Sequence, residues 1–267
     1  MAGADVGLAA GPAAVALPGP QDGSDGPGVT GAGARPDSAS RTRGLTVDRI
    51  EISGGELYGL AEARGFLARG TVGSRLGSAT LTVGQLGGRL YGERTAGVAL
   101  ARPLRRTLAA EVGWRLLSLG AAGVPERTTM AFDAGVAARV LGRIVVAAAW
   151  RNIGDARIGD SPVSAGASLQ AALLLDEISL AGSFELDPAL GSSFALGCEA
   201  PVSEWLRVRA GVALDPGTFG AGIGIGRGPG EEDGRGGTLL AWPVVDIAVT
   251  WHPDLGGSSF ATITFCR

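Results

Sequence analysis

Ten charged residues stand alone among small and apolar residues, and they are the first candidates for chemistry. They are Glu111, Arg115, Asp133, Arg139, Arg151, Glu185, Glu199, Arg207, Arg209 and Asp246. Each occupies the polar side of a segment in which apolar and polar residues alternate, so carboxylates and guanidinium groups from different segments can meet on one face. Two interpretations are open: these side chains line a permeation path, or they form a cross-strand network of charges that fills the interior. We favour the network.

Catalytic groups are scarce. The single histidine, His252, precedes Pro253 in a predicted turn, and Asn152 and several serines are available in principle. No nucleophile motif such as G-x-S-x-G accompanies them. We therefore predict that the protein is not an enzyme.

Cofactor and metal motifs are equally weak. Cys198 and Cys266 lack metal-ligand spacing, and with one histidine they cannot build a zinc site, so one optional disulfide is the most they can form. Gly222, Gly224 and Gly226 give G-x-G-x-G, but no helix pattern follows that could bind a phosphate. We predict no cofactor and no metal, and interpret these glycines as inward strand positions.

The composition narrows the class of protein. The chain has 267 residues, 46 of them glycine, which is more than twice the usual share of about 7%. No G-x-y register is present, and 45% hydrophobic residues argue against wholesale disorder. A formal net charge of −3 gives no electrostatic footprint for a nucleic acid. No apolar run reaches the roughly 18 to 20 residues of a membrane-spanning helix, so any membrane crossing must use strands.

A two-residue period dominates the chain after about residue 44. In 107–118, Val112, Trp114 and Leu116 share one face while Glu111 and Arg115 share the other. The same alternation recurs in 129–140, 144–151, 177–186, 194–200, 206–214 and 245–251. Weaker candidates lie near 47–58, 65–72, 76–84, 88–92, 95–102, 164–174, 219–225 and 258–266. Turn signals rich in Gly, Pro, Asp and Asn separate these runs, so we predict about 14 to 15 strands joined as consecutive hairpins.

Such strands suit either a soluble sandwich or a transmembrane barrel. The polar face here is mostly Gly, Ala, Ser and Thr with isolated charges, whereas a sandwich surface in water usually carries denser charge. A closed barrel also leaves no exposed edges, and its crowded interior favours small residues. We predict an all-β, closed antiparallel transmembrane barrel of about 14 strands. Seven strand glycines should point inward: Gly113, Gly135, Gly166, Gly197, Gly211, Gly222 and Gly224.

Five tryptophans fall near predicted strand ends: Trp114, Trp150, Trp205, Trp242 and Trp251. They suit the aromatic girdle that membrane barrels carry at the lipid interface, although an ordinary core role is equally open.

The first 43 residues differ from the remainder. Residues 1–43 are rich in Ala, Gly, Pro and Ser without an apolar period, which predicts an extended or disordered arm or plug before a barrel of residues 44–267. The arm is a poor signal peptide, because no positive charge precedes its apolar part and Asp5 stands where the segment should be basic. A signal peptide is thus not visible in this chain.

The C-terminal half resembles the PorV/PorQ family of outer-membrane proteins, which is itself similar to the FadL-like fatty-acid transport barrels. The likeness rests on Arg151-Asn152-Ile153-Gly154, the Glu199 strand leading into Leu206-Arg207-Val208-Arg209-Ala210-Gly211, the strand from Phe219 to Gly226, Asp246, and the His252 to Gly256 turn. It covers about residues 107–267 and implies a 14-stranded barrel in the bacterial outer membrane with an N-terminal segment in or beneath the lumen. The family's Asn-Pro-Ala motif is absent, and Phe265 stands two residues before the C-terminus.

The resemblance implies a non-enzymatic barrel that binds secretion-system or exported proteins during protein export or surface attachment. The alternative is a FadL-like transporter that passes hydrophobic small molecules and therefore needs a continuous apolar patch inside. An all-β structural protein that polymerises through its strands is a further possibility. Outer-membrane lipid is an expected partner in the first two cases, and nucleic acid in none.

Overall fold

A computed structural model gives the fold of the chain. It describes residues 46–266, apart from residues 61–62, 75, 89, 176–177, 189–190, 215–216 and 227–242. The predicted arm at 1–43 and Trp242 therefore lie outside the described residues.

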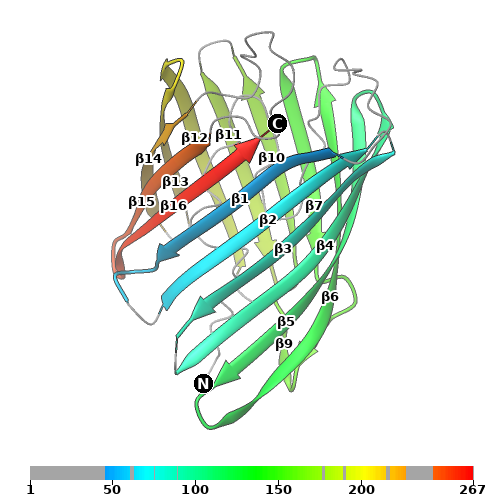
Figure 1. Ribbon diagram of the computed structural model, residues 1–267, viewed down its shortest axis with the longest axis vertical. Helices are drawn as coiled ribbons and strands as arrows, with labels where there is room; N and C mark the ends of the chain where they lie inside the picture. Colours follow the sequence, from blue (N-terminus) through cyan, green and yellow to red (C-terminus); the bar gives the residue numbers. More distant parts are fainter. Residues whose placement is uncertain are drawn as a thin grey trace.

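Fourteen antiparallel strands close into a single barrel (Figure 1). They are β1 (Thr46–Glu56), β2 (Arg64–Ser74), β3 (Gly77–Gly87), β4 (Tyr91–Arg105), β5 (Leu108–Ala121), β6 (Val124–Val140), β7 (Ile144–Arg151), β10 (Gly166–Leu174), β11 (Ser179–Asp187), β12 (Gly191–Ser203), β13 (Leu206–Leu214), β14 (Thr218–Ile225), β15 (Val244–His252) and β16 (Gly256–Cys266). Neighbours in sequence pair in space, and β1 pairs with β16 to complete the ring. The predicted closed barrel of about 14 strands is confirmed.

Strand boundaries follow the alternating segments closely where both faces of the strand have a distinct character. The segments 144–151 and 206–214 coincide with β7 and β13. Two predictions were wrong in detail: 88–92 and 95–102 belong to one strand, β4, with a turn before it, and the predicted turn at 152–162 contains a small hairpin of β8 (Arg157–Ile158) and β9 (Ser161–Pro162). The described residues include no helix long and apolar enough to cross a membrane.

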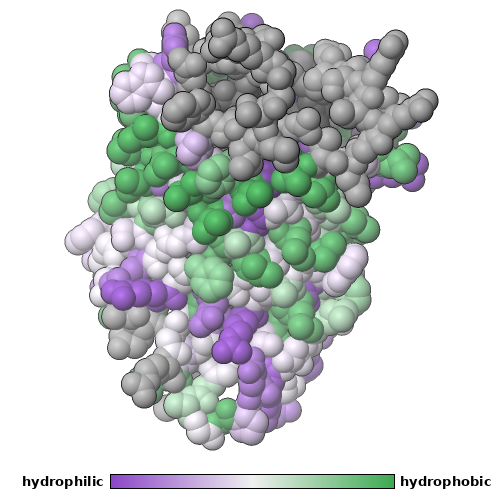
Figure 2. Space-filling view, viewed as in Figure 1, coloured by the Kyte–Doolittle hydropathy of each residue, from purple (hydrophilic) through white to green (hydrophobic). Residues whose placement is uncertain are grey.

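The apolar face of each strand points out of the barrel. In β5, Val112, Trp114 and Leu116 are 56%, 39% and 44% exposed, whereas Glu111 between them is 6% exposed. Figure 2 shows the hydrophobic side chains gathered as a band across the barrel, with polar residues toward its lower end. Large aliphatic and aromatic side chains are costly to expose to water over so wide a surface, so the band matches the hydrocarbon region of a bilayer.

Small residues make the inner wall. Ala137, Ala147 and Ala149 pack as a buried cluster on neighbouring β6 and β7. The seven glycines predicted to point inward lie in the same register as the buried side chains, and Gly135 and Gly224 are themselves buried. Short side chains on this face leave room for the few long charged ones.

Candidate functional site: the charged inner wall

The centre of the charged network is a triad that spans four strands. Arg209 on β13 donates from Nε to Oε2 of Glu199 on β12 and from Nη1 to Oδ1 of Asp246 on β15. Glu199 and Arg209 are directly paired across the two strands, whereas Asp246 lies two strands from Arg209. The Glu199 side chain is fully buried, and those of Arg209 and Asp246 are 14% and 19% exposed. One guanidinium thus holds two carboxylates inside the wall.

A glycine on the intervening strand makes the longer reach possible. Gly224 on β14 is the register partner of both Arg207 and Asp246. A Cβ atom at this position would lie 2.5 Å from Asp246 Oδ1 and 3.6 Å from Arg209 Nη2. The absence of a side chain therefore leaves the space in which the Arg209–Asp246 pair forms.

The same arrangement occurs on the neighbouring strands β7, β10 and β11, the last of which pairs with β12. Arg151 on β7 forms an ion pair with Glu185 on β11, and β10 lies between them. Gly166 on β10 is the register partner of Arg151, and a Cβ atom there would lie 3.3 Å from Arg151 Nη2. The Arg209–Asp246 and Arg151–Glu185 pairs thus each cross an intervening strand at a glycine.

A third pair joins adjacent strands and organises a loop. Arg115 on β5 donates to both carboxylate oxygens of Asp133 on β6, with Nε–Oδ2 and Nη2–Oδ1 distances of 2.6 and 3.0 Å. Asp133 Oδ1 also accepts from the backbone N–H of Asn152, at 2.9 Å. A bidentate guanidinium–carboxylate contact fixes orientation as well as charge.

Asn152 closes the loop between β7 and β10. Its side chain donates from Nδ2 to the Val163 carbonyl at 2.8 Å, and its Oδ1 accepts from the Ala156 N–H at 3.0 Å. The residue is 2% exposed and its φ is +51°, a conformation that asparagine tolerates better than most residues. The Arg151-Asn152-Ile153-Gly154 segment therefore has a structural role in this protein: it joins the ion-paired wall to the loop that carries β8 and β9.

The other predicted inward residues are Glu111, Arg139 and Arg207. Glu111 is 6% exposed on β5, and Arg139 and Arg207 lie half-buried near one end of β6 and β13. Arg207 lies in the same register row as Gly224 and Asp246, beside the triad, whereas Arg139 lies opposite Val145 on β7. A permeation role for the ten charged residues stays a prediction.

Sequence reasoning missed a charged group on β1. Arg49 Nη2 and Glu51 Oε2 lie 3.0 Å apart, and Glu51 is opposite Arg69 on β2. The signal was available, since Arg49 and Glu51 alternate with the exposed Ile50 and Ile52.

An apolar patch lies on the inner face of β16, β1, β2 and β3, next to the Arg49–Glu51 pair. It comprises Leu67, Leu86 and Phe260, with Leu57 just after the end of β1. Leu67 Cδ1 lies 2.9 Å from where a Gly84 Cβ would stand, and the Phe260 ring covers Gly55 in the same way. Two of these side chains thus lie over glycines of the neighbouring strands.

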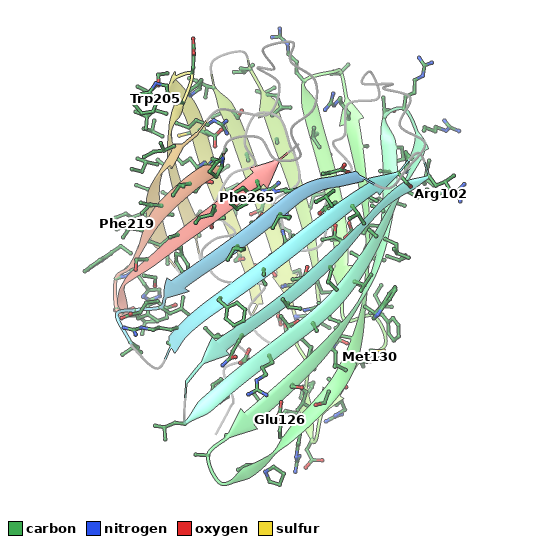
Figure 3. All side chains as sticks on the ribbon, in the orientation of Figure 1. Arg102, Glu126, Met130, Trp205, Phe219 and Phe265 are labelled. Carbon is green, nitrogen blue, oxygen red and sulfur yellow. The ribbon has the colours of Figure 1, made fainter. Side chains whose placement is uncertain are left out.

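Three aromatic residues mark the two ends of the outer belt. Trp150 and Trp251 are 47% and 48% exposed near the end of the barrel where β7 and β15 finish, and Trp205 is 56% exposed in the β12–β13 turn at the opposite end. Figure 3 shows Trp205 and Phe219 projecting outward at different heights. Trp114, also exposed, lies beside Phe132 on the outer face. Of the five tryptophans, only Trp242 lies outside the described residues.

The described residues offer few groups for metal binding or thiol chemistry. Within the described ranges, no group of three or more His, Cys, Asp or Glu side chains could hold a metal ion. Cys198 is a free thiol on the outer face of β12. The ion pairs of the inner wall fix charged side chains, its small residues widen the interior, and Asp133 and Asn152 orient the β7–β10 loop.

The ends of three strands, β4, β5 and β6, project from the barrel beyond the apolar belt, and Tyr91 at the start of β4 pairs with Ala121 at the end of β5. Figure 1 shows β5 and β6 extending past the other strands at the lower end, and they hold 14 and 17 residues. Their outward face becomes polar there: Arg94 and Glu126 are 3.4 Å apart in an exposed ion pair, and Ser118 and Thr128 are hydrogen-bonded at 2.8 Å. We call this part, residues 91–95 and 117–129, the blade.

Among the described residues, no strand pairs with one edge of the blade, although the β8–β9 hairpin contacts β6 there: a Cβ atom at Gly159 would clash with the Arg127 side chain. We call this the open edge. Pairing between β6 and β7 begins at Ala134 and Trp150, so the first ten residues of β6 extend beyond β7. Arg139 donates its N–H to Thr107 next to β5, whereas the Phe132 carbonyl, seven residues earlier, accepts from Ile153 on the β7 side. By alternation, the backbone groups of Glu126, Thr128 and Met130 also point away from β5. The hairpin of β8 and β9 lies nearby as a separate two-stranded sheet.

Comparisons with known proteins identify the fold. No family model and no curated protein sequence matches the chain. The outer membrane protein Omp33 of Acinetobacter baumannii has a similar structure, with a TM-score of 0.52 and 9% identity over 84% of this chain and 99% of that one. A Pseudomonas aeruginosa FadL homologue gives 0.48 and 10% over 83% and 89%, and the KdgM porin gives 0.47 and 7% over 82% and 99%. The chain thus has the fold of an outer-membrane β-barrel.

Proposed function

We propose that this protein is a non-enzymatic barrel of the bacterial outer membrane that acts as a partner-binding barrel in protein export or surface attachment, in the manner of the PorV/PorQ family. The blade is the observation that supports this proposal. Five residues of β5 beyond Leu116 correspond to about 17 Å along the strand, so a sheet with one edge unpaired among the described residues stands outside the apolar belt. Extended segments of other proteins bind such edges by adding a strand.

The ion-paired inner wall supports the same function. Its charges are held by partners on neighbouring strands, which suits a stable scaffold that presents a surface to other proteins. Exported proteins or secretion-system components are the expected partners, because a barrel in the outer membrane meets them as they cross or attach.

The edge of the blade provides the test. Thr128→Pro removes one N–H from the open edge and leaves the β5–β6 ladder intact, because that N–H points away from β5. Thr128→Ala is the matched control, since both variants lose the hydroxyl that bonds Ser118. In cells lacking the natural gene, the alanine variant should restore the surface proteins that the deletion removes, and the proline variant should not. Unchanged surface proteins after deletion would reject the function.

A second candidate is passage of hydrophobic small molecules, as in FadL-like barrels. The apolar inner patch at Leu67 and Phe260 favours it. Leu67→Asn would place an amide on that surface and should reduce entry of a hydrophobic fluorescent probe into protein-loaded vesicles. If the unaltered protein gives no more entry than empty vesicles, this candidate fails, and partner binding is unaffected.

A further inference from the structure

Three arginines gather at the end of the barrel where β1 begins and β16 ends. Arg102 and Arg105 are on β4 and Arg106 is in the following turn, and all three are exposed. No Asp or Glu occurs among the described residues of the β2–β3, β4–β5 and β6–β7 turns. We call these three residues the arginine rim.

The rim is compact because its three arginines lie within five consecutive residues, 102–106, at the end of β4 and in the turn before β5. A single phosphate or two adjoining ones can therefore meet more than one guanidinium group.

The rim also lies at the margin of the apolar belt. Arg102 pairs with the outward-facing Ala110 and follows Leu100, which is 45% exposed, by two residues on the same face. Figure 3 shows Arg102 projecting away from the barrel. Leu104, which lies between Arg102 and Arg105, is 55% exposed. An arginine here can place its stem among acyl chains and its guanidinium among headgroups.

We infer that the arginine rim binds the phosphates of anionic phospholipids in the membrane leaflet at this end of the barrel. Guanidinium groups recognise phosphate through two parallel hydrogen bonds, and the interspersed leucines favour lipid over a soluble acidic partner. At the opposite end, Arg64 and Arg94 are held in ion pairs with Glu56 and Glu126. We therefore place the preference for anionic lipid at the end that carries the rim.

The test compares two triple variants in neutral detergent. R102Q/R105Q/R106Q removes the rim, and R64Q/R94Q/R157Q removes the same charge from the other end of the barrel. Lipid retained by the folded protein is counted by native mass spectrometry after addition of phosphatidylglycerol or phosphatidylcholine. Each rim arginine should contribute about fivefold to the preference for phosphatidylglycerol, equivalent to ~1 kcal/mol. The rim variant should lose at least tenfold, and the control variant should keep the preference.

Other outcomes would overturn the inference. They are an equal preference in the unaltered protein and the rim variant, displacement of phosphatidylglycerol by inorganic phosphate at the same concentration, or binding of polyglutamate without any lipid preference. If the triple variant does not fold, Arg102→Gln alone should lower the preference about fivefold, and an unchanged value would equally reject the inference. None of these results bears on the blade.

Discussion

Replacing Gly224 with alanine should break the Arg209–Asp246 ion pair and lower the free energy of unfolding by about 1 to 2 kcal/mol. The new methyl group would lie 2.5 Å from Asp246 Oδ1, about 1 Å short of ordinary van der Waals contact. The carboxylate must move, which costs a charge-assisted hydrogen bond of about 1.5 to 3 kcal/mol. Replacing glycine with alanine within a strand stabilises the fold by about 0.5 to 1 kcal/mol. Subtracting this gain from the cost of the lost hydrogen bond gives the expected loss in the free energy of unfolding.

The matched control is Gly113→Ala, at another inward strand position. Its Cβ atom would meet Val98 O at 3.4 Å, an ordinary contact, so this change should stabilise by about 0.5 to 1 kcal/mol. Urea unfolding in lipid vesicles, followed by tryptophan fluorescence, measures both. In the Asp246→Ala background, Gly224→Ala should lose its cost, a coupling of about 2 kcal/mol. If Gly224→Ala behaves like Gly113→Ala, or its cost persists without Asp246, the steric explanation is wrong.

Three further outcomes are expected. Arg209→Gln should lower the free energy of unfolding by about 3 kcal/mol, because it leaves the carboxylates of Glu199 and Asp246 in the inner wall without their guanidinium partner. The free energy of unfolding of Glu199→Gln should stay within about 1 kcal/mol of that of the unaltered protein. Equal losses of the two variants in urea unfolding would contradict the triad. Asn152→Ala removes the bonds to Val163 and Ala156 and should speed proteolysis of the β7–β10 loop without changing the barrel's melting temperature; an unchanged cleavage rate would argue against its loop-closing role. Folded protein should migrate differently from boiled protein on a denaturing gel, and a single mobility in both samples would exclude a closed barrel.

The barrel was predictable because its signal is local. Each strand inside the belt alternates apolar and small residues, as in 144–151 and 206–214, and turn residues separate the strands. The signal ends where a strand leaves the belt, because water then meets both faces. For this reason the start of β6 before residue 129 was missed, and Glu93 and Arg94 divided β4 into two predicted segments. The blade, the feature that supports partner binding, is the part with the weakest sequence pattern.

The pairing of charges was not predictable, although the inward charged positions were proposed from the sequence. Arg209 and Asp246 are 37 residues apart, and their contact depends on the registers of β13, β14 and β15 together. A one-residue shift in either register would turn one of them toward the lipid. Arg49 and Glu51 were overlooked because Gly54 and Gly55 weaken the alternation of β1. The register of the strands depends on the closed ring as a whole, so the sequence of a single strand does not predict it.

The most direct test of the inward polar register uses spin labels along β13. In protein whose two cysteines have been replaced, a label is placed in turn at Ala210, Gly211, Val212 and Ala213, and its collisions with oxygen and with a water-soluble nickel chelate are measured in lipid vesicles. Labels at 210 and 212 should collide more with oxygen, which concentrates in the bilayer, and labels at 211 and 213 should not. A reversed pattern, or no alternation along the strand, would contradict a barrel whose small and charged residues face inward.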